Sequence, residues 1–560
     1  MSTNRYKHRF TWLAGLATIV SCVIGCGVIP TVPLSAGSFL NVSTEQTGGV
    51  LREALTQSID TLDPIHLNSA GAVEIAGALY QGLVGFDEKG RVIPAIAVNW
   101  NVDASKTVYT FQLRPGVKFT NGREVTVNDV VYSLTRLLDP KNHAPNAWML
   151  GWAIVGADAF RKGQASSIRG LQVIDTHTLE IQLTVPEAYF LKVLAMPFCS
   201  VVPTEVVEQY GAEFGKHPVG TGPFRLITWT ATEIEAERNP FYWKSDAPRL
   251  TGLHFQLATP ANVAVREWKA GKIDLLTPSG VNFSEQDLTS LRSQSKWDKL
   301  LRSQVDNAVV YTGMNVQMKP FDNIKVRKAL NDAIDRAKLV VAIGGRGRVA
   351  TGILPPNIDG FDPSRTGQAY NPTEARALLA EAGYPNGFDT VLWTPSDAES
   401  MAVARSIQMD LANVGVRAKI NPVTLHELVS ATTRPANVPL FNMAWMQDYP
   451  DPDDFLNTLF HSANAGPYNE TWYINHLVDQ QLNEGRQMSN GKERSALYTK
   501  IESEVLADAP WIPEYWPVSY GIAHSNVHGY AIPVTGGTNY ASIWLSQSAA
   551  GSAPRSQHWY

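Results

Sequence analysis

The stretch from residue 444 to residue 455 concentrates side chains that could bind a cation. It reads Ala-Trp-Met-Gln-Asp-Tyr-Pro-Asp-Pro-Asp-Asp-Phe, so a tryptophan stands three residues before the first aspartate, Asp448, and two prolines follow. Proline fixes its own φ and drives the preceding residue out of the helical region, which leaves the backbone near Asp448 few conformations. A carboxylate held in this way could receive a positively charged group of a ligand.

The same aspartates permit two other interpretations. Aspartate and proline are frequent in turns, so the run could be a solvated acidic turn that binds nothing. Asp448, Asp451, Asp453 and Asp454 could also offer hard oxygen ligands to calcium, but the run lacks the glycine and the distal glutamate of an EF-hand loop. We therefore predict no metal site.

Motifs of enzyme active sites are nearly absent from the sequence. It contains no Gly-x-Ser-x-Gly, no Gly-x-x-x-x-Gly-Lys-Ser/Thr and no His-Glu-x-x-His. Ser293 and Lys296 have the Ser-x-x-Lys spacing, which often arises by chance, and the glycines at 344–347 follow a predicted helix instead of preceding one. These patterns predict no catalytic residue and no cofactor, and a secreted hydrolase or amidase, which would need a nucleophile with a base, stays open as an alternative.

Composition places the chain among ordinary globular proteins. Of its 560 residues, 44% are hydrophobic and 18% are charged, and the formal net charge is −5. A chain of this length is expected to hold roughly two to four domains. A nucleic-acid partner would require a basic surface, which this composition does not indicate.

The first 29 residues have the pattern of an export signal. Three basic residues precede an uncharged apolar run from Phe10 to Ile29. The run is also long enough to remain in the membrane as an uncleaved anchor. Either way, the globular part is expected outside the cytoplasmic membrane, in the periplasm or at the cell surface.

The three cysteines of the chain refine this prediction. Val23-Ile24-Gly25-Cys26 resembles a bacterial lipoprotein cleavage box, which predicts a signal peptide at 1–26 and lipidation of Cys26; Cys22 ends a similar box. Residues 27–47 are rich in Ser, Thr, Gly and Pro and are predicted to be a flexible tether. The remaining Cys199 cannot form an internal disulfide, so packed cores must stabilise the protein.

Hydrophobic periodicity predicts a mixed α/β chain. Strands are expected at 51–55, 179–183, 224–229, 233–237 and 253–257, and a hairpin at 109–119 that turns at Arg114-Pro115-Gly116. Helices are expected at 72–80, 126–138, 321–343, 371–383, 401–414 and 495–506, the second of them starting with a capping-box pattern at Thr126 and Asp129. No internal repeat is visible, which argues against a solenoid or a propeller.

An ordered set of short motifs covers nearly the whole mature chain. Its members are Leu62-Asp63-Pro64, Gly82-Leu83-Val84, the 109–119 segment with Asn121-Gly122, and the motifs at 128–133, 218–224, 238–243, 326–330 and 381–385, followed by the stretch 444–455. This set resembles the extracellular solute-binding proteins of family 5, which include the dipeptide- and oligopeptide-binding proteins of bacterial ABC importers.

The resemblance implies an α/β, two-lobed periplasmic binding protein fold with an extra inserted subdomain, in which a hinge closes the lobes on the ligand. Lobe I would comprise 48–84, 218–308 and 517–547, the inserted subdomain 85–217, and lobe II 309–516. The implied function is that of a monomeric, non-catalytic receptor that captures oligopeptides and delivers them to an ABC permease in the membrane. Relatives in the family also bind nickel chelates, sugars or opines, so a non-peptide solute is the alternative.

The resemblance also assigns candidate ligand contacts. In relatives, the aspartate of a Trp-x-x-Asp pattern receives the α-ammonium group of the peptide, and here that pattern is Trp445 and Asp448. The residues expected along the ligand backbone are Asn68, Ser69, Ala70, Ala444 and Met446. Asp451, Asp453 and Asp454 keep the role of turn and helix-start residues.

Two further tryptophans are candidate walls of the ligand pocket. Trp148 and Trp516 each offer a large rigid surface with one N–H donor, and core packing is the alternative role for both.

One departure from the family bears on ligand length. Dipeptide-binding relatives have an arginine for the peptide carboxylate shortly before the helix predicted at 401–414, but residues 393–403 contain no basic residue and Arg405 lies inside that helix. A peptide longer than two residues is therefore favoured over a dipeptide.

Overall fold

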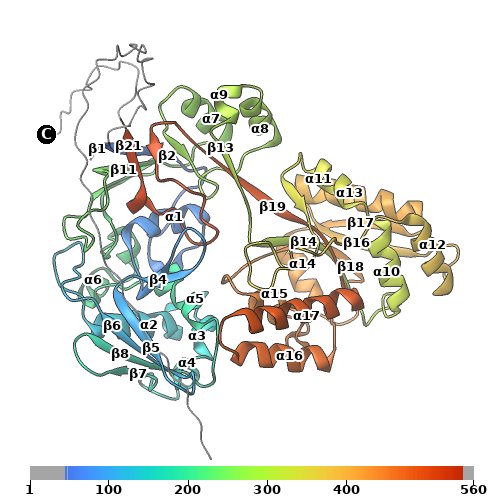
Figure 1. Ribbon diagram of the computed structural model, residues 1–560, viewed down its shortest axis with the longest axis horizontal. Coiled ribbons are helices and arrows are strands. Elements are labelled where there is room, and N and C mark those ends of the chain that lie inside the picture. Colours follow the sequence, from blue (N-terminus) through green and yellow to red (C-terminus); the bar gives the residue numbers. More distant parts are fainter. Residues whose placement is uncertain (1–44, 47, 547–560) are drawn as a thin grey trace, which may run out of the picture. The chain divides into compact units, whose positions relative to one another are not determined.

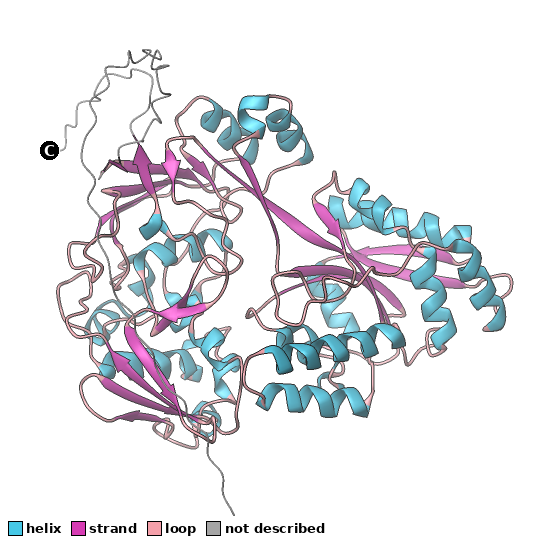
Figure 2. Cartoon of the chain, in the orientation of Figure 1, coloured by secondary structure: helices cyan, strands magenta, loops and turns pink. Residues whose placement is uncertain are grey.

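The computed structural model describes residues 45–46 and 48–546 (Figures 1 and 2). The predicted signal peptide with Cys26 and most of the predicted tether lie outside the described residues. Among the helices within the described residues, none has both the length and the apolar composition of a membrane span. Lipidation of Cys26 therefore stays a prediction.

One long strand, β19 (Trp511–Ala523), belongs to both halves of the largest sheet. Its first residues pair with β14 (Ala308–Met314), and later ones with β13 (Leu301–Val305) and β12 (Leu275–Leu276), all antiparallel. Figure 1 shows β19 in orange-red between the two groups of strands. A short strand, β15 (Gly347–Val349), also pairs with it.

Four further strands form the half of the sheet that follows β12. These are β2 (Val50–Ala54), β11 (Gly252–Gln256), β10 (Glu233–Arg238) and β9 (Phe224–Trp229). In β10 the apolar Ile234 and Ala236 are buried and alternate with glutamates, as expected for a strand with one face on the core. All four strands lie within one residue of the predicted strand positions.

The other half of the sheet carries the acidic stretch. Its strand β18 (Leu440–Met446) pairs with β14 along its whole length, and beyond it lie β16 (Asp389–Pro395) and β17 (Arg417–Val423). All seven residues of β14 are buried, which fits a central strand. Figure 2 shows helices on the flanks of these strands, and α13 (Ala398–Asn413) is one that packs on β16 and β17.

A separate four-stranded sheet forms within the segment predicted as the inserted subdomain. Its order is β5 (Ala97–Val102), β6 (Val108–Leu113), β8 (Thr178–Gln182) and β7 (Leu171–Val173). Helix α2 (Val127–Leu138) starts with the predicted capping box of Thr126 and Asp129. The boundaries of the lobes and of the inserted subdomain stay predictions.

The remaining helices and strands complete the chain. The helices are α1 (Ala70–Leu79), α3 (Trp148–Gly151), α4 (Ala157–Arg161), α5 (Phe190–Leu194), α6 (Thr204–Tyr210), α7 (Ala261–Lys269), α8 (Glu285–Arg292), α9 (Ser295–Asp298), α10 (Ile324–Ala333), α11 (Arg336–Ala342), α12 (Pro372–Glu381), α14 (Leu425–Thr432), α15 (Pro452–Phe460), α16 (His476–Gln487) and α17 (Lys492–Asp508). The strands are β1 (Glu45–Gln46), β3 (Val84–Phe86), β4 (Val92–Pro94), β20 (Val527–His528) and β21 (Trp544–Ser546).

Two predicted elements are wrong in detail. The 109–119 segment is not a hairpin, because β6 pairs with β5 and β8 and only an isolated bridge forms at Lys118. Val117 and Phe119 are nevertheless buried. The alternation of apolar and polar residues here therefore reflects burial of the side chains and not pairing of strands. The single helix predicted at 321–343 is two helices, because Asp335 caps a new helix by accepting hydrogen bonds from Ala337 N and Lys338 N.

The interpretation of the acidic stretch as a solvated turn is also wrong. Asp451 does cap α15, as expected for a helix-start residue, by accepting a hydrogen bond from Asp453 N at 3.0 Å. However, Asp451, Asp453 and Asp454 are each 0% exposed. A buried carboxylate needs charged or hydrogen-bonding partners, and each of the three has them.

Two cations hold Asp451 in place. Arg494 of α17 donates to both of its carboxylate oxygens, at 2.6 and 3.0 Å, and Lys192 of α5 donates at 3.0 Å. Burial by itself raises the pKa of Asp451, but the charges of Lys192 and Arg494 outweigh it and hold that pKa at about 2. Lys192 is 259 residues away in sequence, so local sequence could not predict the burial.

Asp453 anchors the same turn through aromatic hydroxyls. Its carboxylate accepts hydrogen bonds from Tyr449 at 2.9 Å and Tyr498 at 3.1 Å, and Arg486 lies 3.5 Å away. Tyr449 also stacks on Tyr189, with ring centroids 4.8 Å apart. The turn after β18 is therefore fixed by contacts from α5, α16 and α17.

Removal of the Asp451 carboxylate should destabilise the protein strongly. Asp451→Ala leaves Arg494, which is 2% exposed, as an unpaired buried cation, and such a loss costs roughly 3–5 kcal/mol of unfolding free energy. Asp389→Ala is the matched control. Asp389 pairs with Arg417 at the same distance, 2.6 Å, but both of these side chains are exposed. Denaturant unfolding of both variants compares them. If the two variants lose similar amounts of unfolding free energy, burial of the Asp451 pair does not have this role.

Candidate functional site

The connection from β18 to α15 positions Asp448. Met446 ends the strand, and Gln447 N still donates to Asn307 O at 3.0 Å, which extends the pairing with the residues before β14. Asp448 N then turns away and donates to Asp454 Oδ2 at 2.9 Å. The strand end and the first turn of α15 thus fix the backbone of Asp448 from both sides.

Asp454 couples the two residues of the Trp-x-x-Asp pattern. Its Oδ2 accepts a second hydrogen bond, from Trp445 Nε1 at 3.1 Å, so one oxygen holds both Trp445 and Asp448. The other oxygen, Oδ1, is buried and has no hydrogen-bond partner among residues 45–46 and 48–546. Burial, together with the nearby charge of Asp448, raises the pKa of Asp454 well above its usual value. This carboxyl therefore keeps its proton more readily than a free aspartate does.

The side chain of Asp448 differs from those of Asp451 and Asp453, because no cation among the described residues neutralises it. Within the described residues, no lysine, arginine or histidine forms an ion pair with Asp448. Burial raises the pKa of this partly buried side chain to about 6. Above that pH the group is a carboxylate that lacks a partner of opposite charge.

Asp448 lines a cavity of about 420 Å³. The cavity is formed by the start of α1, the end of β13, the end of β18 and the loop at 532–538. Among the predicted site residues, Ala70, Met446 and Asp448 lie in its wall, and Met446 is 70% exposed. The structure therefore brings these three predicted residues together around one space.

The other predicted contacts lie outside the lining of this cavity. Asn68 and Ala444 are exposed, while Ser69 caps α1 by accepting a hydrogen bond from Ala72 N at 3.2 Å. Trp445, the penultimate residue of β18, is partly buried, and its indole N–H donates a hydrogen bond to Asp454. Ligand contact by these residues stays a prediction.

The two additional tryptophans have different surroundings. Trp148 is partly buried, with its ring centroid 6.1 Å from that of Tyr468, and the pKa of Tyr468 is raised by burial and by the Asp448 charge. Trp148 and Tyr468 therefore lie on the side of the molecule that holds Asp448. Trp516 is 0% exposed and packs edge-on against Phe361, so its surroundings are those of a core residue.

Sequence reasoning missed three polar residues of the cavity wall. Asp306 and Asn307 lie between β13 and β14, and Gln447 follows β18. Gln447 accepts from Asn307 Nδ2 and donates to Thr535 Oγ1, both at 2.9 Å. Gln447 is an unassigned position inside the Trp-x-x-Asp pattern, whereas Asp306 and Asn307 belong to no recognisable motif and reach Asp448 through the long-range pairing of β14 with β18.

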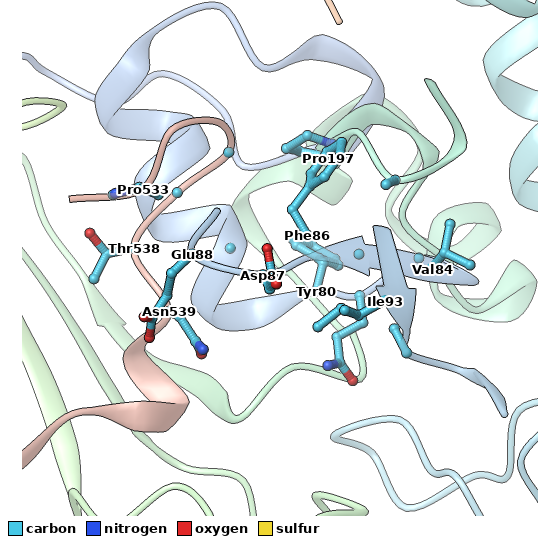
Figure 3. A pocket seen from close by; sticks show the side chains of 18 of the residues that line it. Tyr80, Val84, Phe86, Asp87, Glu88, Ile93, Pro197, Pro533, Thr538 and Asn539 are labelled. Carbon is cyan, nitrogen blue, oxygen red and sulfur yellow. The ribbon is translucent and has the colours of Figure 1, made fainter. Parts of the chain in front are cut away.

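A second, smaller cavity of about 190 Å³ adjoins the loop at 532–538 (Figure 3). Pro533 and Thr538 of that loop, together with Pro197, line both cavities. Figure 3 shows Asp87 and Glu88 near this loop, and Asp87 is paired with Arg91 at 2.6 Å. None of the predicted ligand contacts lines it, so the cavity at Asp448 is the candidate ligand site.

The chemistry that the Asp448 cavity offers is recognition of hydrogen-bond donors and cations. Within the described residues, no cluster of three or more His, Cys, Asp or Glu side chains has an arrangement that could hold a metal ion. The polar groups on the wall are carboxylates, amides and hydroxyls.

Comparisons with known proteins agree with this architecture. The family model "Bacterial extracellular solute-binding proteins, family 5 Middle" matches residues 91–467. The glutathione-binding protein GsiB of Salmonella typhimurium is 32% identical over 469 residues, which are 82% of this chain and 87% of that protein.

Solved structures show the same fold. HbpA2 from Haemophilus parasuis superposes with a TM-score of 0.80 at 27% identity, over 89% of this chain and 100% of that chain. The periplasmic binding protein DppA from Helicobacter pylori, in complex with the peptide STSA, has a TM-score of 0.70 at 26% identity, over 90% and 99%. The fold is thus the two-lobed α/β fold of periplasmic binding proteins, and the chain belongs to family 5 of the bacterial extracellular solute-binding proteins.

Proposed function

We propose that this chain is the ligand-capturing component of an ABC importer, and that its ligands are short peptides with a free amino terminus. One observation carries the proposal: Asp448 is a partly buried carboxylate in a cavity wall and, within the described residues, has no ion-pair partner. An α-ammonium group is the charged group that all unblocked peptides share. Bound there, it would supply the missing positive charge.

The edge of β18 supports a peptide ligand. Strand β16 pairs with β18 only at Leu440 and Phe441, whereas β14 pairs with β18 up to Met446. Among the described strands, the stretch 442–446 therefore has one edge without a partner. An extended peptide can add to such an edge through main-chain hydrogen bonds, which do not depend on the peptide's side chains.

The relatives support the same class of ligand. One is named a glutathione-binding protein, and the Helicobacter pylori structure holds the peptide STSA. By this proposal the chain binds without catalysis, acts as a monomer at the outer side of the cytoplasmic membrane, and is anchored through lipidated Cys26. Closure of lobe I (48–84, 218–308, 517–547) against lobe II (309–516) would present the bound peptide to the permease.

Loss of the Asp448 carboxylate should weaken peptide binding. Removing one partner of a desolvated charge pair costs roughly 2–5 kcal/mol, so Asp448→Ala should raise Kd by about tens to thousands of fold. Isothermal titration calorimetry with the tetrapeptide Ala-Gln-Ala-Ala measures the change. Asp298→Ala, an exposed aspartate on α9, is the control and should bind as the wild type does. Equal Kd values for the two variants would show that Asp448 does not bind the ammonium group.

Peptide binding should also weaken in acid. The pKa of Asp448 is raised to about 6, so the group takes up a proton at a higher pH than a free aspartate and then no longer attracts an ammonium group. For Ala-Gln-Ala-Ala, Kd should be constant above that pH and rise by about tenfold for each unit below it, the slope for one linked proton.

The Asp448→Asn variant is the control for this pH dependence, because it cannot titrate. Its Kd should be weak and should not change across the same range. Asp454 and Tyr468 face Asp448 and Asp306 lines the same cavity, and burial raises the pKa of each, so the variant that cannot titrate at position 448 is needed to separate Asp448 from them. If the Kd of Asp448→Asn rises with falling pH as that of the wild type does, another group is responsible for the pH dependence.

A further inference from the structure

The charges of the Asp448 cavity are all of one sign. Among the described residues that line it, the charged side chains are Asp306 and Asp448, and none is a lysine, an arginine or a histidine. A cavity that receives a carboxylate needs a cation or several N–H donors on its wall. The wall of this cavity is instead suited to ligands with positive charge.

Asp306 is the second carboxylate and lies apart from the Trp-x-x-Asp pattern. Its carboxylate accepts one hydrogen bond, from Ser519 Oγ at 2.8 Å, and its backbone N–H donates to Pro517 O at 2.9 Å. Burial raises the pKa of Asp306 to about 6. Within the described residues it forms no ion pair, so at neutral pH it offers a negative charge that β19 holds in place but does not neutralise.

The neighbouring Asn307 adds an independent observation. Its side chain is buried, at 4% exposure, and its Nδ2 donates to Gln447 Oε1 at 2.9 Å and to Val534 O at 3.0 Å. Both amide hydrogens are thereby used, which fixes the amide orientation. Its carbonyl oxygen Oδ1 has no hydrogen-bond partner in the part of the chain that the structure describes, although Asn307 lines the cavity. An unpaired buried acceptor next to Asp306 calls for a hydrogen-bond donor from a water or a ligand.

The strand register places the two carboxylates on two neighbouring segments of the chain, one before β14 and one after β18. Asn307 and Gln447 are paired at the common end of β14 and β18, so Asp306 and Asp448 are the next residue on each chain. Asp448 N donates to Asp454 and Asp306 N donates to Pro517 O, so the two residues are held by different parts of the fold. The cavity wall therefore carries two carboxylates, one from each of the two neighbouring segments.

We propose that Asp306, together with the carbonyl oxygen of Asn307, selects peptides that carry a basic side chain in addition to the α-ammonium group at Asp448. This inference rests on the proposed peptide-binding function. Two unneutralised carboxylates attract a ligand with two positive groups and repel a ligand with carboxylates placed in the cavity. Glutathione carries two carboxylates and one ammonium group, so it is a poor match for this wall. The chain and its glutathione-binding relative should differ in ligand.

The test compares matched peptides by calorimetry at a pH above the pKa of both carboxyls. The Lys series is Ala-Lys-Ala-Ala, Ala-Ala-Lys-Ala and Ala-Ala-Ala-Lys; each has a partner with Gln in place of Lys, and reduced glutathione is a further probe. In the wild type, at least one Lys peptide should bind about tenfold or more tightly than its Gln partner, as expected for one additional charge pair. Glutathione should bind more weakly than that Lys peptide.

Asp306→Asn keeps the shape of the side chain and removes its charge. In this variant the ratio of the Kd values for the Gln and Lys peptides should fall to within about twofold, and measurable binding of the Gln peptides shows that the variant is folded. Asp298→Asn, at an exposed position on α9, should keep the full preference.

The possible results separate this inference from the proposed function. If the Lys and Gln peptides bind equally to the wild type, or if Asp306→Asn keeps the preference, the role of Asp306 is wrong while peptide binding stands. If glutathione binds more tightly than every Lys peptide, the inferred ligand class is wrong. If no peptide of either series binds to the wild type, the peptide-binding function fails, and the inference fails with it.

Discussion

A carboxylate removed from water must be neutralised or must keep its proton, and this constraint organises the segment after β18. Asp451 is neutralised by Arg494 and Lys192, and Asp453 is held by tyrosine hydroxyls near Arg486. Asp454 has hydrogen-bond donors but, in the described part of the chain, no cation, and its pKa is raised. These buried groups fix the turn, so Asp448 has a defined position before any ligand arrives.

Asp448 and Asp306 show the other outcome of the same constraint. Neither forms an ion pair within the described residues, and both lie in the wall of one cavity with raised pKa values. Stability alone does not explain two such groups, because burial without a partner is unfavourable for the charged form. A ligand that brings positive charge would remove this cost, so the unfavourable local electrostatics become a source of affinity and selectivity.

Much of the fold could be predicted from local patterns, but much of the site could not. Alternation and turn residues located β9, β10 and β11, and the Thr126–Asp129 pattern predicted the start of α2. The family motifs predicted the fold and pointed to Asp448. The burial of Asp451 was missed because its cations come from distant helices, and Asp306 was missed because only the pairing of β14 with β18 brings it to the cavity. Sequence patterns report local backbone preferences, whereas charge neutralisation depends on three-dimensional contacts.

The central claim is that this cavity binds unblocked peptides and selects them by positive charge. The most direct measurement is to mix the purified protein with a digest of short peptides, wash it, denature it and identify the released compounds by mass spectrometry against the input mixture. The account predicts enrichment of peptides with a free α-amino group and at least one lysine or arginine. Enrichment of acidic or amino-terminally blocked peptides, with basic peptides depleted, would contradict it.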